Sequence, residues 1–232
     1  MSKRKPRYHR HRFPPDIISY AVWLYYRFSL SFRHVEDLPA ERGVIVSYES
    51  IRRWCLKFGP QYRRSLKRRE GRLGDVWHVD EVFITFRGQI HYLWRAVDQD
   101  GDVIDILVQR RRNALAAKRF FNKALKSQGA APLLLITDRL KSYPPAAREV
   151  LRGTHHDATQ YANNRAEVSH QRTRQRERQM RRFKSLHQAQ RFLSVHARVN
   201  NLFRYGRHLL RAPNHRLFRT RAFGVWQQVT CA

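Results

Sequence analysis

The spacing of apolar residues divides the chain into two parts of different architecture. Over residues 14–70, apolar side chains recur at the three- and four-residue intervals of amphipathic helices. The third of these helices is predicted to begin after Ser47, a residue suited to cap it, and Gly43 lies in the turn before it. Its buried face is predicted to comprise Ile51, Trp54, Cys55 and Phe58. A short helix, a glycine-containing turn and a further helix form the helix-turn-helix pattern, although a plain helical bundle would give the same periodicity.

From residue 74 onward the pattern changes to that of an α/β fold. Runs rich in β-branched and aromatic residues predict three antiparallel strands, followed by a crossover helix and a continuous apolar run suited to a buried strand. The predicted bounds of these elements are 76–86, 89–98, 102–109, 113–127 and 133–137. Further helices are predicted at 142–151, 163–182 and 187–210, with a short strand near 154–161. This order is that of ribonuclease-H-like folds, so we predict a mixed five-stranded sheet with flanking helices over residues 74–212, and a C-terminal tail over 213–232.

The net charge of the chain indicates what it binds. Forty-seven lysines and arginines stand against 18 acidic residues, and the abundant polyanion that a protein of net charge +29 meets is nucleic acid. Residues 1–13 are a basic arm too poor in apolar residues to order alone, so we expect it to stay flexible until it meets phosphates, unless it is merely a solubilising tail. Between residues 165 and 221 sixteen basic residues face two acids, whereas a solvated helix face would mix both signs. We therefore expect double-stranded DNA as the partner, contacted by Tyr48, Arg52, Arg53, Lys57, Lys141, Arg165, Arg172 and Arg174.

Other classes of protein fit the sequence less well. No apolar run approaches the roughly 20 residues of a membrane-spanning helix, and the N-terminus lacks the apolar stretch of a secretory signal. Cys55 and Cys231 are the only cysteines, so neither a disulfide framework nor a zinc site is expected. We expect a protein of the bacterial cytoplasm that associates with the nucleoid and with no membrane.

The scarcity of acidic residues draws attention to where they occur. Asp80 and Glu81 are adjacent in a predicted apolar strand, and since a strand sends neighbouring side chains to opposite faces, only one of them can face a given site. Periodicity does not choose between them, and an acid paired with a nearby arginine is the structural alternative. Asp138 ends the most apolar strand, and Glu167 lies in the first turns of an otherwise basic helix. Two aspartates on adjacent strands and a glutamate from a helix would hold the pair of divalent metal ions that phosphodiester chemistry uses.

Longer motifs around these acids carry a resemblance to a known family. The chain resembles transposases of bacterial insertion sequences, the DDE type of insertion-sequence family six, in the stretches WHVDEVFI, LLLITDRLKSY, YANNRAEVSH and SYESIRRWCLKFG. The resemblance covers nearly the whole chain and implies that Asp80, Asp138 and Glu167 are the catalytic triad and hold two Mg²⁺ ions, with Mn²⁺ as a substitute. It also implies that Glu81 is a supporting or paired acid. The separation between Asp138 and Glu167 is shorter than usual in such enzymes, which keeps Glu149 and Asp157 as lesser candidates.

The same resemblance implies an activity and an assembly. Such enzymes have a ribonuclease-H-like core, cut and join DNA at short terminal inverted repeats, and in this family form replicative products. Two ends must be synapsed, so we expect a homodimer or a larger assembly on DNA. The rival interpretations are a helix-turn-helix regulator without enzymatic activity and an inactive remnant of a mobile element. The three acids favour the enzyme over the regulator, because a regulator has no need of Mg²⁺.

Overall fold

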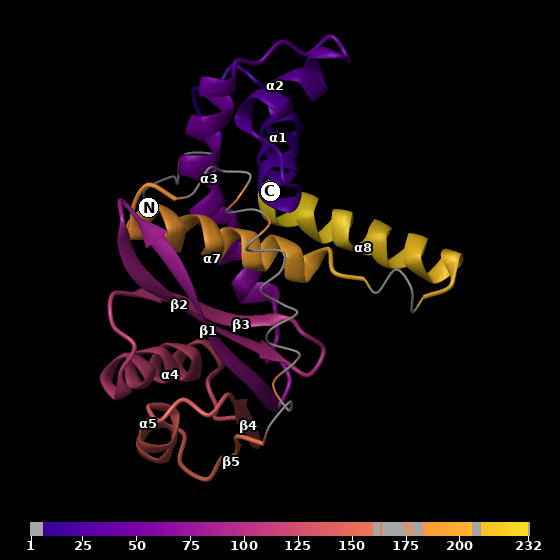
Figure 1. Cartoon of the computed structure of the whole chain (residues 1–232). Coiled ribbons are helices and arrows are strands. Elements are labelled where there is room, and N and C mark those ends of the chain that lie inside the picture. The colour runs from indigo at the N-terminus through magenta and orange to yellow at the C-terminus, as the bar shows by residue number, and fades with distance from the viewer. Residues whose placement is uncertain are drawn as a thin grey trace, which may run out of the picture. The chain divides into compact units, whose positions relative to one another are not determined.

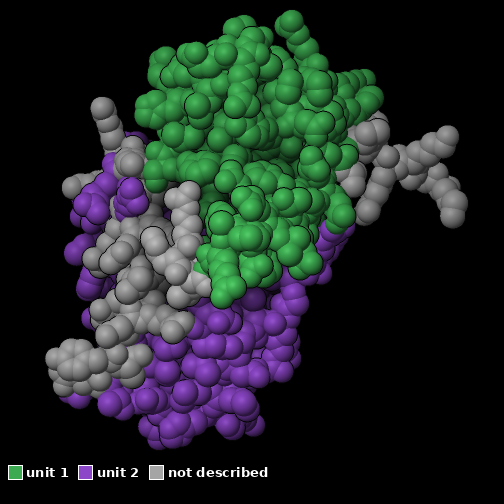
Figure 2. All heavy atoms as spheres, turned by 90° about the vertical axis from the view of Figure 1, so that its right-hand side faces the viewer, with its two compact units in different colours: residues 1–66, 202–232 green, residues 67–201 purple. Residues whose placement is uncertain are grey.

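The computed structural model of the chain describes residues 7–159, 163, 175, 178, 183–205 and 210–231. The chain folds into two compact units, shown in different colours in Figure 2. Unit 1 comprises residues 1–66 and 202–232, and unit 2 comprises residues 67–201. In the part of the chain that the structure describes, no helix has both the length and the apolar character that a membrane span requires.

Unit 1 is helical, as the periodicity of its first segment predicts. Its helices are α1 (Pro15–Arg27), α2 (Phe32–Ala40), most of α3 (Tyr48–Arg69) and α8 (Ala212–Thr230). Ser31 caps α2, because its hydroxyl accepts a hydrogen bond from the His34 backbone N–H at 3.0 Å. Gly43 adopts the left-handed conformation in the turn that follows, with φ of 74°. The structure therefore has a helical region over residues 14–70, with a glycine in the turn before α3.

The two ends of the described chain in unit 1 differ from what we predicted. Residues 7–13, predicted to be flexible, pack on α3 and α8: the Tyr8 hydroxyl lies 2.5 Å from both the Tyr62 hydroxyl and the Thr230 carbonyl oxygen. Residues 213–232, predicted to be a tail, form helix α8, whose Trp226 ring packs edge-on against Tyr62. The physical reason is the same at both ends. A few aromatic side chains bury enough surface to order each segment, although the many basic residues make its overall composition look polar.

Unit 2 is built around one mixed sheet. Its strands are β1 (Val76–Phe86), β2 (Gln89–Asp98), β3 (Val103–Gln109), β4 (Leu134–Thr137) and β5 (His155–Asp157), in the order β3-β2-β1-β4-β5. The first three are antiparallel, and β4 and β5 are parallel to β1. Arg87 and Gly88 both have positive φ, as the tight hairpin between β1 and β2 requires. Three antiparallel strands followed by a crossover to a parallel pair form the ribonuclease-H-like arrangement, so the predicted fold class is confirmed.

Helices cover both faces of this sheet. Helices α4 (Ala114–Gln128) and α5 (Tyr143–Val150) lie on one side and α7 (Leu186–Leu202) on the other (Figure 1). The core on the α4 and α5 side includes Trp77, Val79, Trp94, Phe120 and Phe121, all buried. Helix α7 ends at Leu202, earlier than the predicted 187–210, and the helix predicted at 163–182 lies almost wholly outside the described residues.

Side chains of α7 also cover the edge of the sheet. The side-chain amides of Gln190 and Asn201 pair with backbone groups of β3, and the Arg198 guanidinium donates a hydrogen bond to the Ile104 carbonyl oxygen at 2.6 Å. An edge strand whose backbone groups are occupied in this way no longer offers a template for pairing with another chain. The sheet is thereby held as a fixed platform for the residues that follow β3 and β4.

Candidate active site

Strands β1 and β4 bring two of the predicted acids together. The two strands run side by side in parallel, and their register pairs Val79 with Thr137. The residues that follow are Asp80 and Asp138, so the register places these two aspartates next to each other. The turn after β4 is fixed locally, because the Leu140 backbone N–H donates to Asp138 Oδ1 at 3.1 Å. Two carboxylates from adjacent strands therefore meet at the end of β4.

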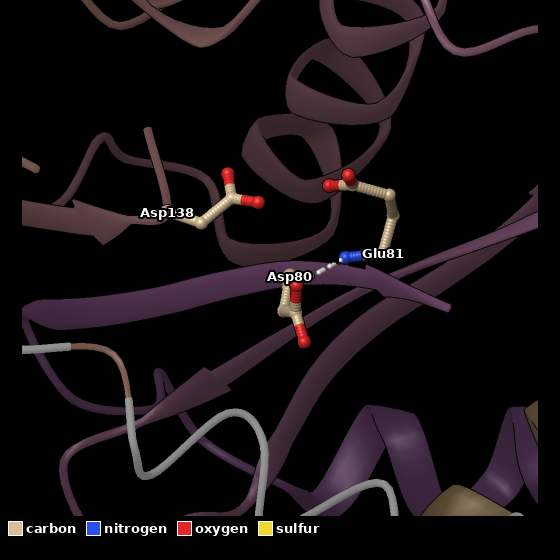
Figure 3. Close-up of side chains that lie close together, drawn as sticks. All are labelled: Asp80, Glu81 and Asp138. Atoms are coloured by element: carbon tan, nitrogen blue, oxygen red, sulfur yellow. Dashed lines mark hydrogen bonds between the residues drawn. The ribbon is translucent and has the colours of Figure 1, made fainter. Parts of the chain in front are cut away.

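A third carboxylate lies beside this pair. Asp80, Glu81 and Asp138 each offer one carboxylate oxygen, and these oxygens all lie within 4.8 Å of one another. Asp80 and Glu81 leave β1 in opposite directions, while the carboxylates of Glu81 and Asp138 face each other (Figure 3). Asp80 Oδ1 accepts a hydrogen bond from the Glu81 backbone N–H at 2.8 Å. Both aspartates are partly exposed whereas Glu81 is buried, so the aspartates are the carboxylates that a solute can reach.

Glu81 is held by two partners on the side of the sheet that α5 covers. The Arg112 Nε–H donates to its Oε1 at 2.5 Å, and the buried Tyr143 hydroxyl donates to its Oε2. Burial is the strongest influence on the Glu81 carboxyl and raises its pKa to about 7, although Tyr143 and Arg112 both favour the charged form. Glu81 is therefore a paired acid, as we expected, and both of its oxygens are already engaged.

The charge of Asp138 is disfavoured by burial and by the neighbouring carboxylate of Asp80. Burial raises the pKa of its carboxyl, the neighbouring charge of Asp80 raises it further, and the Leu140 N–H and Arg112 oppose both effects. Arg112 Nη2 lies 3.7 Å from Asp138 Oδ2, so one arginine serves two of the three carboxylates. Carboxylate oxygens are the ligands that Mg²⁺ prefers, and a divalent cation would offset the repulsion between Asp80 and Asp138. The donor set therefore fits the metal that the sequence implies.

The third member of the predicted triad lies outside the described residues. Glu167 is in that part of the chain, as are Arg165, Arg172 and Arg174. The two lesser candidates for the third acid are described and have other partners: Glu149 forms an ion pair with Lys118, and Asp157 accepts hydrogen bonds from Thr159 in its own loop. Neither belongs to the acidic group found among the described residues.

The predicted DNA contacts of unit 1 lie together on α3. Tyr48, Arg52, Arg53 and Lys57 are all exposed there. Glu49 binds Arg52 through two hydrogen bonds of 2.7 Å and Arg53 through one of 3.1 Å. The pKa of the Glu49 carboxyl is lowered to about 2, chiefly by the hydrogen bond from Arg52. Lys57 lies 2.8 Å from His11 of the arm. In unit 2, Lys141 is exposed in the turn between Asp138 and α5.

The roles of Arg112, Tyr143 and Asn163 could not be predicted from the sequence. Arg112 and Tyr143 are 31 and 62 residues from Glu81, so no local motif connects them with it. The Asn163 side-chain amide donates to the Val79 carbonyl oxygen at 2.7 Å, and Asn163 is buried. This contact ties the chain just before Glu167 to the residue just before Asp80, a structural role that the motif itself does not reveal.

Comparison with known proteins adds a family to this geometry. The family model described as DDE domain matches residues 74–206, a range that includes Asp80, Asp138 and Glu167. The transposase for insertion sequence-like element IS431mec of Staphylococcus aureus is 30% identical over 164 residues, which cover 68% of this chain and 73% of that protein. The transposase for insertion sequence element IS257 in transposon Tn4003, from the same species, matches with the same identity and coverage. The alignment with these transposases is longer than the match to the family model over residues 74–206, so the similarity is not confined to the DDE domain.

Among solved structures, the HTLV-2 integrase catalytic core domain in complex with magnesium is similar to part of this chain. It shares 12% sequence identity, with a TM-score of 0.41, over 63% of this chain and 95% of that one.

Proposed function

Because the chain belongs to the DDE transposases, a family of polynucleotidyl transferases, we propose that it is the transposase of an insertion sequence of family six. In this proposal it binds the terminal inverted repeats of the element, cuts DNA there and joins the freed 3′ end to target DNA. The observation that carries the proposal is the juxtaposition of Asp80 and Asp138 on neighbouring parallel strands, inside the segment that matches the DDE domain.

Asp80 and Asp138 are the proposed metal ligands, with Glu167 completing the set. Both aspartates are accessible, and each has an oxygen within 4.8 Å of the other. Two Mg²⁺ ions, when bound, would activate the attacking oxygen and stabilise the leaving one. The contribution of the chain is to hold the carboxylates: the register of β1 and β4 sets their spacing, and the Leu140 N–H orients Asp138.

Two observations favour Glu167 over Glu81 as the third ligand. Both Glu81 oxygens are engaged by Arg112 and Tyr143, so its coordination of a metal would require these contacts to break. Asn163, anchored to Val79, is four residues before Glu167, and four residues of chain span at most about 14 Å. Glu167 is therefore within reach of Asp80 by chain length alone.

Helix α3 is the proposed reader of the element ends. Its exposed Tyr48, Arg52, Arg53 and Lys57 lie where a second helix of a helix-turn-helix motif contacts bases and phosphates. Lys141, Arg165, Arg172 and Arg174 are proposed to contact phosphates near the acids. A homodimer or larger assembly would hold two ends together, and replicative products are the outcome proposed from the family.

The experiment that tests this function is a Mg²⁺-dependent strand-transfer assay on cloned element ends. The full-length protein is expected to join end DNA to a target plasmid, and EDTA should stop the reaction. Asp138→Asn and Glu167→Gln should each abolish cleavage and joining while binding of the ends stays near normal, since neither residue is needed for recognition by α3. Glu149→Gln is the matched control and should retain activity. Strand transfer that proceeds without a divalent metal, or that is retained by Asp138→Asn, would refute the proposed acid set.

A further inference from the structure

Unit 2 contains a basic hollow that the proposed catalytic residues do not use. It has a volume of about 500 Å³ and lies where β3 ends and α4 begins. Its lining includes Leu107, Gln109, Arg110, Arg111, Asn113 and Arg119. We refer to it below as the arginine hollow. None of the side chains that line it is acidic, so any ligand it binds is expected to be anionic.

The three arginines of the hollow differ from the cations around them. Arg112, Lys118 and Lys123, which lie on the same stretch of chain, each form an ion pair with an acid. Arg110, Arg111 and Arg119 form no ion pair with any residue that the structure describes, and all three are exposed. In a chain with few acids this is common on a surface, but here three such arginines line one concavity. Their position around a single hollow favours a binding site over a solvated face.

The hollow is also held in shape by its own side chains. The Gln109 side-chain amide donates to the Ala116 carbonyl oxygen at 2.8 Å, and the Asn113 Oδ1 accepts from the Ala116 N–H at 3.0 Å. The backbone N–H of Val108 donates to Gln190 Oε1 at 2.8 Å. These bonds fix both ends of the loop that carries Arg110 and Arg111, so little order has to be gained when a ligand binds. Helix α4 is 15 residues long, and the N-terminus of such a helix adds a partial positive charge to the hollow.

The position of the hollow in the chain connects it with the acids. Arg112 follows Arg111 directly, and its guanidinium contacts both Glu81 and Asp138. A polyanion whose reactive bond lies at Asp80 and Asp138 would therefore have its next charged groups close to the loop that carries Arg110 and Arg111. Guanidinium forks bind phosphate oxygens in pairs, with a fixed geometry that a lysine does not offer.

We propose that the arginine hollow binds backbone phosphates of double-stranded DNA beside the bond that reacts, without reading its sequence. This inference rests on the proposed function, because it takes DNA to be the substrate at Asp80 and Asp138. The phosphates come either from the element end or from the target, and the same groups would bind both. An acidic protein segment is the competing ligand, and it would leave DNA affinity independent of these arginines.

The test compares two double variants of the full-length protein. Arg110→Gln with Arg111→Gln removes two charges from the hollow, and Arg148→Gln with Arg152→Gln removes two charges from exposed positions in and just after α5, which serves as the control. Binding of a fluorescent duplex of random sequence is measured by anisotropy between low and moderate salt. The hollow variant should lose roughly tenfold in affinity for each arginine, and the slope of log K against log salt should fall by about 1.8. The control should change neither by more than about a third of that.

Two further arms identify the source of the phosphates. Binding of a terminal-repeat duplex reports on the element end, and strand transfer from a pre-cleaved end, measured against plasmid concentration, reports on the target. A rise in the plasmid concentration needed for half-maximal transfer, with end binding unchanged, assigns the hollow to target DNA, and the reverse pattern assigns it to the end. Arg110→Lys with Arg111→Lys should restore most of the salt slope and less of the affinity.

The outcomes separate this inference from the proposed function. If the hollow variant behaves like the control while the wild-type protein binds DNA and transfers strands, the hollow is not a DNA site and the proposed function stands. If the wild-type protein itself neither binds nor transfers DNA, the proposed function fails first. Circular dichroism of both double variants shows whether folding is intact, and the lysine variant keeps the comparison valid if the glutamine variant unfolds.

Discussion

Replacing Arg112 by alanine tests how the acidic site is held when no metal is bound. Arg112 is the cation that reaches both Glu81 and Asp138, and its removal leaves Glu81 with Tyr143 as its remaining partner among those described here. The Glu81 side chain is 1% exposed, so in the wild-type fold its carboxylate depends on protein partners rather than on water. The expected result is a loss of stability whose size depends on pH, because a buried carboxyl that loses its cation binds a proton instead.

The magnitude follows from the pKa of Glu81. Burial raises this pKa from 4.5 to about 7 in the folded protein. A carboxyl with a raised folded pKa contributes stability that is present below pH 4.5 and is lost as the pH rises through 7. Without Arg112 the pKa of Glu81 in the folded protein rises further. The variant therefore continues to lose stability above pH 7, where the wild-type protein no longer loses stability through Glu81. Each pH unit above 7 then adds up to about 1.4 kcal/mol to the difference, or about 2 kcal/mol by about pH 8.5.

The assay is equilibrium urea unfolding in EDTA, followed through the fluorescence of the tryptophans, among them Trp77 and Trp94 in the core of unit 2. At pH values well below the Glu81 pKa of about 7, protonation of Glu81 reduces its need for a cation, and Arg112→Ala should cost about 1 kcal/mol or less. The control is the same substitution made in a Glu81→Gln background, where its cost should not vary with pH. A pH-independent cost in the wild-type background, or a pH dependence that survives Glu81→Gln, would refute the reasoning.

Two other predictions concern local structure and recognition. Asn113→Ala removes the cap of α4 and should cost about 1 kcal/mol in urea unfolding, whereas Asn122→Ala, an exposed change inside the same helix, should cost much less; equal costs would contradict the capping role. Glu49→Gln releases Arg52 and Arg53 to bind phosphates, so affinity for random duplex and its salt slope should rise in a gel shift while discrimination in favour of the element end falls. Arg52→Gln with Arg53→Gln should lower both affinity and slope, and unchanged values would mean that α3 is not the reader.

The strands and the pair of aspartates could be predicted because their signals are local. Alternation, turn glycines and a continuous apolar run gave the bounds of β1 to β3 to within one residue, and the carboxyl end of β4 located Asp138. Helix α8 was missed although Ala222, Trp226 and Val229 are buried at helical spacing, because three arginines in the same segment outweighed them in the composition. Arg112 and Tyr143 could not be predicted, since their link to Glu81 exists only after β1, α5 and the loop after β3 have been brought together.

The adjacent acids of β1 have different surroundings because a strand sends them to opposite sides. Glu81 points to the side where α5 supplies Tyr143 and the loop after β3 supplies Arg112, and burial there shifts it toward the neutral form. Asp80 leaves on the other side and stays accessible, and the register of β1 and β4 places it beside Asp138. If both acids had been charged and accessible, three carboxylates within 4.8 Å would repel one another whenever no metal was present. The ion pair between Arg112 and Glu81 lowers that repulsion without removing either aspartate, as the proposed use of Asp80 and Asp138 as metal ligands would require.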